Sequence, residues 1–441
     1  LWGVSTDQVS KRGADHTTNG IRMGIDGWIY IAVGDFGFVS CQGTDDHALT
    51  MRGGGVLRVR PNGTEIEPYA WGLRNIVDVA VDPYLNLYTR DNTNDGGGWD
   101  IRLSHIVQSA EYGYPSRYKN FSDEIFPPLK DYGGGSGCGA MYLQDLRWPE
   151  GFGDALYTCD WGTSKVYRHV LPEVAPTFEA HQEVFLDIPR PTDIDVDGRG
   201  LMYVSSWKGG KFNFAGPNVG FVAQIRPVGF LPKPVPVVAE LTDAELLNEF
   251  RSPSAARRLH AQRELLHRDK DEQRVELVRR FAADKANPKT ARIAAIFTLK
   301  ELEGRFAEEA LLELVKDDAV REWAMRALTD REDGLPHVPT APFVEALSDE
   351  NPWNRAQALI SLGRLWANDV GAEVLPLTKR TSGELPGGDK PWAQPDPGRV
   401  LPHLAVRMLV DTHAIDACLK GLEGEYFDGA VRALREITNR R

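Results

Sequence analysis

The sequence predicts a multidomain chain in which an all-β propeller is followed by an all-α solenoid of HEAT-like repeats. Three observations predict this fold. Four segments in the first half repeat a turn, an apolar alternation and a tyrosine. The second half spaces its Ala and Leu residues with helical periodicity. A proline-rich stretch separates the two halves, and glycine and tyrosine become less frequent after it.

Each repeat of the first half is typical of the tyrosine-bearing strand of a propeller blade. The tyrosines recur at intervals of 46 to 69 residues, as in blades that carry long loops. The four segments are GIDGWIYIAVGD (24–35), VDPYLNLYTRDN (81–92), GFGDALYTCDW (151–161) and VDGRGLMYVSSW (196–207). Three apolar segments with an Arg and then a Pro predict outer strands, at 54–63, 164–172 and 221–229. We expect about four to five blades and an incomplete ring that lacks N-terminal blades.

The predicted boundaries are 1–229 for the propeller, 230–238 for the linker FLPKPVPVV and 239–441 for the solenoid. The first helix should begin at a capping box made by Thr242 and Glu245. Paired helices at intervals of 30 to 50 residues are typical of HEAT-like stacking. The predicted helices include 255–268, 290–304, 318–330, 351–366, 401–411 and 428–438, and the Gly- and Pro-rich stretch 378–399 should be a long loop.

Composition excludes several functional classes. The 441 residues are 42% hydrophobic and 26% charged, and a formal net charge of −12 without a basic cluster argues against a nucleic-acid partner. No apolar run is long enough to span a membrane. The four cysteines form no CxxC or CxxCH motif, and Cys41 and Cys138 could either pair or remain free thiols. The chain begins with Leu inside an apparent repeat unit, so we expect a fragment.

The stretch 71–115 carries the strongest chemical signal. It joins an Arg-Asn pair, a strand, a loop rich in Asn, Asp and Gly, and the aromatic turn EYGYP. An arginine, backbone carbonyls and carboxylates at one strand end suit an anionic cofactor together with a hard cation.

Two motifs resemble the soluble quinoprotein glucose dehydrogenase and aldose (sorbosone) sugar dehydrogenase family. One is GADHTTNGIRMGIDGWIYIAVGDFG (13–37), and the other is GLRN followed by a polar loop and EYGYP. The resemblance covers roughly residues 10–230. A propeller joined to HEAT-like helices is similar to large bacterial membrane-associated dehydrogenase proteins that continue into a c-type cytochrome domain, which this sequence lacks.

The resemblance implies a role for each matching residue. His16 would be the general base that takes the proton from a sugar hydroxyl while hydride moves to pyrroloquinoline quinone (PQQ). Asp35 would orient His16. Arg74 and Asn75 would face the quinone, and Arg190 would meet the carboxylates of the cofactor.

Calcium is the second cofactor that the resemblance implies. Asp91, Asn92, Thr93 and Asp95 fall where the family binds the ion, largely through backbone carbonyls. The resemblance also implies a periplasmic or cell-surface location, a sugar or related alcohol as substrate, and a c-type cytochrome as electron acceptor.

Three positions depart from the family pattern. Thr192 replaces an arginine, Val77 replaces a glutamine, and the nearest candidate for the cofactor-binding lysine, Lys165, comes several residues too late. Each lost charge-assisted hydrogen bond removes on the order of 1.5 to 3 kcal/mol of binding free energy.

Structural explanations compete with each functional one. His16 could be a turn histidine, Arg74 could tie two blades together, and 91–100 could be an Asx-rich turn. Trp161 and Trp207 could stack on a sugar or fill the core. Two hypotheses therefore stand: a PQQ- and calcium-dependent dehydrogenase, or a non-catalytic scaffold that binds carbohydrate or protein. The first requires that His16, Arg74 and the 91–95 segment meet in one cleft.

Overall fold

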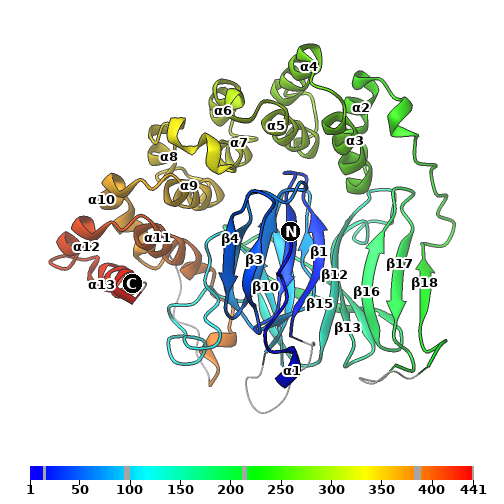
Figure 1. Cartoon of the computed structure of the whole chain (residues 1–441), viewed down its shortest axis with the longest axis horizontal. Coiled ribbons are helices and arrows are strands. Elements are labelled where there is room, and N and C mark those ends of the chain that lie inside the picture. Colours follow the sequence, from blue (N-terminus) through cyan, green and yellow to red (C-terminus); the bar gives the residue numbers. More distant parts are fainter. Residues whose placement is uncertain (13–15, 94–99, 211–215, 382–388, 440–441) are drawn as a thin grey trace.

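The computed structural model contains four β-sheets arranged as propeller blades, with an arc of α-helices around them (Figure 1). It describes the whole chain except residues 13–15, 94–99, 211–215, 382–388 and 440–441. The four blades confirm the predicted propeller architecture. The arc is helical as expected, although its membership of the HEAT class stays a prediction.

Every blade is built from antiparallel strands. From the inner strand outward, the first two blades are β1 (Thr18–Met23), β2 (Ile29–Val33), β5 (Gly54–Val59) and β6 (Glu67–Leu73), then β7 (Asn75–Ile76) with β8 (Ala80–Val81), β9 (Leu87–Thr93), β10 (Asp100–Ile106) and β11 (Lys130–Gly134). The other two are β12 (Gly137–Gln144), β13 (Asp154–Asp160), β14 (Lys165–Val170) and β15 (His181–Asp187), then β16 (Pro191–Val196), β17 (Met202–Ser206) and β18 (Phe221–Ile225). A short helix α1 (Val9–Arg12) and the hairpin of β3 (Phe38–Gln42) and β4 (Ala48–Met51) flank the first blade.

The predicted tyrosines all lie on the second strand of their blade. Three of them donate their hydroxyl to an aspartate in the preceding turn, as Tyr30 does to Asp26 at 2.5 Å and Tyr88 to Asp82 at 3.3 Å. Tyr203 makes the same bond to Asp197 at 3.2 Å. In three of the four blades, the repeated sequence pattern therefore corresponds to a hydrogen bond between the aspartate of the turn and the tyrosine of the strand that follows.

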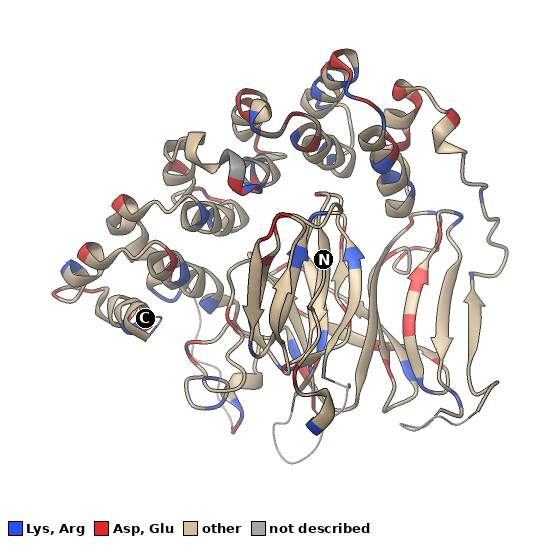
Figure 2. Ribbon diagram, viewed as in Figure 1, with Lys and Arg blue, Asp and Glu red and all other residues tan. Residues whose placement is uncertain are grey.

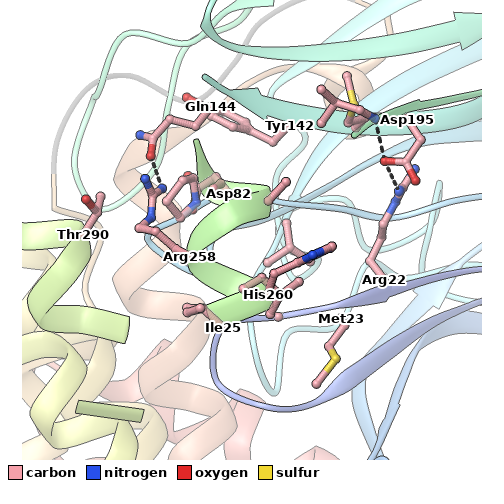
Figure 3. Close-up of a pocket in the computed structure, with 18 of the residues that line it drawn as sticks. Arg22, Met23, Ile25, Asp82, Tyr142, Gln144, Asp195, Arg258, His260 and Thr290 are labelled. Carbon is pink, nitrogen blue, oxygen red and sulfur yellow. Dashed lines mark hydrogen bonds and ion pairs between the residues drawn. The ribbon is translucent and has the colours of Figure 1, made fainter. Parts of the chain in front are cut away.

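The inner strands of the four blades run in the same direction, so their two ends form two different mouths. The starts of β7, β12 and β16 meet the residues before β1 around one cavity. The ends of all four inner strands surround another cavity, of about 300 Å³, which helix α3 covers (Figure 3).

Arg22 of β1 lines the cavity under α3 and connects the inner strands. Its guanidinium donates to the carbonyl oxygens of Ala140 and Ile194, on two other inner strands. It also pairs with Asp195 at 3.0 Å (Figure 3). A further ion pair joins it to Asp78 at 3.4 Å. Burial raises the pKa of Asp78 to about 6, although Arg22 opposes the rise.

Twelve further α-helices follow in the described part of the chain. They are α2 (Asp243–Glu249), α3 (Ala255–His267), α4 (Glu272–Ala283), α5 (Lys289–Glu303), α6 (Glu308–Val315), α7 (Arg321–Leu328), α8 (Ala341–Ala346), α9 (Pro352–Arg364), α10 (Gly371–Val374), α11 (Val400–Asp411), α12 (Ile415–Gly421) and α13 (Phe427–Asn439). The capping box of Thr242 and Glu245 is present as predicted. The described residues of 378–399 form only short 3₁₀ turns.

The arc packs on the first two blades through a shared hydrophobic core and buried ion pairs. Arg58 of β5 is fully buried and pairs with Asp330, just after α7, at 2.9 Å. The indole of Trp28 donates to the same carboxylate at 2.7 Å. Arg364 of α9 reaches Glu67 of β6 at 3.1 Å. The second half of the chain is thus bound to the propeller by charged groups removed from water.

Acidic and basic residues alternate over the helices (Figure 2). No helix among the described residues is both long and apolar enough to cross a bilayer. All four cysteines are free thiols, so Cys41 and Cys138 do not pair.

Candidate active site

A cavity of about 240 Å³ at the start of the inner strands brings the main predicted residues together. His16, Arg74, Asn75 and Asn92 all line it. The convergence required by the enzyme hypothesis is therefore present for these side chains. Asp95 lies outside the described residues.

His16 is held from two sides. Its Nδ1 lies 2.5 Å from Oδ1 of Asp35, and its ring stacks on Phe36 with centroids 4.9 Å apart. Both polar side chains are nearly enclosed, with exposed fractions of 12% for His16 and 9% for Asp35. The backbone of Gly34 lies so close that an added Cβ would meet the His16 carbonyl group at 2.6 Å. The sequence Gly34-Asp35-Phe36 thus forms a seat for the imidazole.

Gly34→Ala should displace His16 from this seat. The new methyl group would overlap backbone atoms, and overpacking of this kind costs about 1–3 kcal/mol. We expect a lower unfolding temperature and loss of the downfield proton NMR signal of the His16–Asp35 hydrogen bond. Gly424→Ala is the matched control, because an added Cβ there meets nothing within 4 Å. An unchanged downfield signal in Gly34→Ala would contradict the seat.

Arg74 and Asn75 are positioned through their backbone. Asp91 accepts the amide hydrogens of Arg74 at 3.1 Å and of Asn75 at 2.8 Å. The Arg74 side chain donates through Nη1 to the carbonyl of Asn92 at 2.9 Å. Its Nε and the Oδ1 of Asn75 are buried and make no hydrogen bond within the described structure. Both atoms are therefore available to a polar ligand.

Three of the residues expected to form a calcium loop belong to a strand. Asp91, Asn92 and Thr93 continue strand β9 and are buried. Their side chains are already used: Asp91 holds the Arg74-Asn75 backbone, Asn92 bonds to Asn75 and Gly137, and Thr93 donates to the carbonyl of Asp100. In the described part of the chain, no group of three or more His, Cys, Asp or Glu side chains could hold a metal.

Burial raises the pKa of Asp91, while the amides of Arg74 and Asn75 and nearby arginines oppose the rise. The buried carboxylate of Asp91 accepts the amide hydrogens of Arg74 and Asn75, so it holds these two residues in position. The loop prediction was wrong here because the Asp, Asn and Thr residues, which usually favour turns, are paired in the sheet.

Two indoles close the cavity. Trp161 follows β13 and Trp207 follows β17, with ring centroids 5.9 Å apart. Arg190 lies 4.7 Å from the Trp161 ring and donates to the carbonyl of Gly210 at 2.7 Å, but it does not line the cavity. Both tryptophans are thus part of the site surface.

The departures from the family pattern are visible in the wall. Val77 and Thr192 both line the cavity, and Thr192 bonds to Ser205 at 2.8 Å. Lys165 is not part of the wall and pairs with Asp187 at 2.5 Å. Among the described residues that line the cavity, Arg74 is the one arginine, and none is a carboxylate.

Sequence reasoning missed the contribution of β12. Ser136, Gly137 and Cys138 form one side of the cavity. Burial raises the pKa of the Cys138 thiol to about 12, which leaves it protonated and a poor nucleophile. The glycine-rich run DYGGGSGCGA was the available signal, because closely approaching backbone requires small residues.

Comparison with known proteins adds little about function. A family model described as a domain of unknown function (DUF7133) matches residues 6–204. No curated protein sequence matches the chain.

Solved structures with similar features include a Thermus thermophilus protein provisionally described as an oxidoreductase (glucose dehydrogenase), with 19% identity, a TM-score of 0.36, and coverage of 48% of this chain and 66% of that one. The PQQ-bound aldose sugar dehydrogenase from Streptomyces coelicolor has 19% identity, a TM-score of 0.35, and coverage of 47% and 61%. Virginiamycin B lyase from Staphylococcus aureus has 13% identity, a TM-score of 0.24, and coverage of 48% and 57%. Less than two thirds of each of these chains is matched.

Proposed function

We propose that the chain is a quinoprotein-type oxidoreductase that oxidises a sugar or related alcohol at the cavity of His16 and Arg74. The observation that carries the proposal is the meeting of a carboxylate-oriented imidazole and a guanidinium in one cavity of about 240 Å³. An imidazole can take a hydroxyl proton near neutral pH. The guanidinium can stabilise negative charge that develops nearby.

The wall fits a planar, conjugated and anionic cofactor such as PQQ. The indoles of Trp161 and Trp207 offer flat apolar surface. The buried Nε of Arg74 and Oδ1 of Asn75 need polar partners. Among the described residues, no lining carboxylate would repel an anion. The chemistry that PQQ supplies when bound is two-electron acceptance as a hydride.

Calcium does not fit the described side chains of 91–93, because backbone and interblade hydrogen bonds already occupy them. The imidazole acts first: Nδ1–H donates to Asp35, which leaves Nε2 as the basic nitrogen for the substrate proton. Asp35 then stabilises the imidazolium. Arg74, held by Asp91 and Asn92, offsets the negative charge that arises opposite the imidazole.

The electron acceptor that we propose is a c-type cytochrome, and the compartment is the periplasm or the cell surface. Both follow from the family resemblance. Mixing the PQQ-loaded protein, an aldose and a purified cytochrome c would test the acceptor, because cytochrome reduction is visible in its absorption spectrum.

The proposed cofactor is tested by titrating the protein with PQQ, with and without Ca²⁺, and then by dye reduction with a panel of aldoses. Arg74→Met should weaken PQQ binding about 10- to 100-fold, because a charge-assisted hydrogen bond contributes roughly 1.5–3 kcal/mol. Arg199→Met is the control, since Arg199 is half exposed and pairs with Asp197 on an outer turn.

Two outcomes would overturn the proposal. If the protein takes up no PQQ, the cavity is not a quinone site. If the protein binds PQQ or an aldose but reduces no dye, the chain is a non-catalytic binding scaffold. The uncharged residues Val77 and Thr192 in the cavity wall would then reflect lost catalysis.

A further inference from the structure

A cavity of about 400 Å³ lies in the seam between the propeller and the helical arc. We call it the seam cavity. The propeller side comprises the turn after β8 and the segment after β14, and the helical side comprises the beginnings of α7 and α9. None of its lining residues lines the cavity of His16. It shares Asp82 and Tyr142 with the cavity under α3 (Figure 3).

Aromatic side chains make up much of the seam cavity wall. They come from blades two and three and from two helices: Tyr84, Tyr88, Tyr142, Phe178, Trp323 and Trp353. Neighbouring contacts fix these rings. The indole nitrogen of Trp323 donates to the carbonyl of Tyr84 at 2.8 Å, and Phe178 packs on Trp353 with centroids 5.4 Å apart. The faces of such rings carry partial negative charge and attract cations.

Negative charge predominates among the lining residues. The carboxylates of Asp82, Glu173, Asp318 and Glu322 face one ammonium group, that of Lys289. Two of these acids are already stabilised. Asp82 accepts hydrogen bonds from the turn that it closes, and Asp318 pairs with Arg321 at 2.6 Å.

Of the other two acids, Glu173 is exposed and Glu322 is partly buried. Within the described structure Glu322 forms no hydrogen bond and no ion pair through its carboxylate, and its side chain is partly buried at the seam. Burial raises its pKa to about 7, while Arg326 and Lys289 oppose the rise from beyond ion-pair distance. A bound cation could therefore pair with this carboxylate without displacing another partner.

The chain itself places a cation on the same aromatic faces. The ammonium nitrogen of Lys289, the first residue of α5, lies 5.3 Å from the centre of the Trp323 ring and 6.0 Å from that of Tyr84. The side chain of Lys289 is exposed, so a better cation could displace it.

We propose that the seam cavity binds a small organic ammonium ion, with its positive nitrogen between Glu322 and the aromatic faces. The aromatic wall favours an alkylated nitrogen, because methyl groups bury apolar surface while the charge remains. A bare metal ion would need a cluster of oxygen ligands, and the described residues provide no such group. The ligand would contact Glu322 and Trp323 of α7 on one side and blade two on the other, so it would also brace the seam.

The test is a calorimetric titration with choline and with 3,3-dimethylbutan-1-ol, its uncharged isostere. We expect choline to bind and the isostere to bind at least about tenfold more weakly, since only the charge differs. Glu322→Gln should weaken choline binding by about tenfold or more. Lys289→Met should strengthen it, because the competing ammonium is gone.

Glu309→Gln is the matched control. Glu309 is the second residue of α6, as Glu322 is of α7, and it is exposed at a different cavity. Glu309→Gln removes one negative charge from the second position of a helix, as Glu322→Gln does, but away from the seam cavity. Choline binding should therefore not change. Unfolding temperatures would establish that both variants fold.

The pH dependence gives a second measurement. Choline should bind more tightly at pH 8 than at pH 6, because Glu322 loses its proton near neutral pH. The charged groups that face Glu322 are Arg326 on its own helix, Lys289 on α5, Asp82 after β8 and Glu173 after β14. In Glu322→Gln, the gain in choline affinity from pH 6 to pH 8 should disappear or become smaller. Any remaining gain would come from Asp82, because burial raises the pKa of Asp82 to about 6.

Equal binding of choline and the isostere, or an unchanged affinity in Glu322→Gln, would overturn the proposal. Binding of a sugar such as methyl glucoside with no binding of choline would also overturn it. None of these outcomes depends on PQQ or on turnover.

Discussion

His16→Ala should lower the rate of sugar oxidation by about 10² to 10⁴-fold, the contribution of a positioned general base. Uptake of PQQ should stay near the wild-type level, because Arg74, Asn75 and the two indoles remain. Dye reduction under saturating PQQ measures the first quantity, and fluorescence quenching of the tryptophans measures the second.

His47→Ala controls for loss of a histidine, because His47 is exposed on the β3–β4 hairpin. Asp35→Asn should give a smaller loss than His16→Ala, since the imidazole remains but its orientation and charge support weaken. Equal activity of His16→Ala and wild type would remove the imidazole from the mechanism while leaving cofactor binding open to the Arg74 test.

Asp330→Ala should destabilise the fold by about 3–5 kcal/mol, because it leaves buried charge without its partner. Arg58 is fully buried and would keep one carboxylate partner, Glu67, and the backbone carbonyl of residue 330, while the Trp28 indole would lose its acceptor. Urea unfolding, followed by tryptophan fluorescence, would measure the change. We expect the loosening to begin at the seam, where Asp330 joins the arc to blade one.

Asp369→Ala is the control, an aspartate on a helical turn with no ion pair among the described residues. Burial works to raise the pKa of Asp330, but Arg58, Arg60 and the Trp28 hydrogen bond outweigh it and hold the pKa below the usual value. A depressed folded pKa stabilises the fold above the unfolded pKa and loses this effect as pH falls further. The difference between wild type and Asp330→Ala should therefore shrink below about pH 4. A difference that stayed constant into strong acid would contradict the ion-pair explanation.

The sequence was informative about the propeller because each blade repeats a local pattern. An aspartate turn followed by an alternating strand with tyrosine places a hydroxyl on the turn carboxylate, as in Asp26 with Tyr30. Both partners lie within a few residues of each other. Helix boundaries were similarly accessible, because the Thr242 capping box depends on neighbours three residues apart.

Only part of the candidate site was accessible in this way. His16, Arg74 and Asn75 were found because short motifs surround them. The Asp91–Thr93 segment was misread as a loop, since turn-forming residues also pair in a sheet when interblade hydrogen bonds satisfy them. Arg190 lies against the ring of Trp161, which lines the cavity, and its contact with a cofactor stays a prediction.

The seam cavity could not be predicted at all. Glu322 and blade two line the same cavity although more than two hundred residues of sequence separate them, and the repeat 81–92 signals a strand rather than a binding site. The residues that line the seam cavity come together only when the helices pack against the propeller.

Arg22 of β1 donates to carbonyl oxygens of the inner strands β12 and β16, so it ties three blades together. Each of these inner strands runs from one mouth to the other, so a change in its length reaches both ends. Inserting or deleting one residue in β12 would turn its side chains by half a period and alter both mouths at once. Engineering of either mouth should therefore use substitutions, while changes of length belong in the outer strands and their loops.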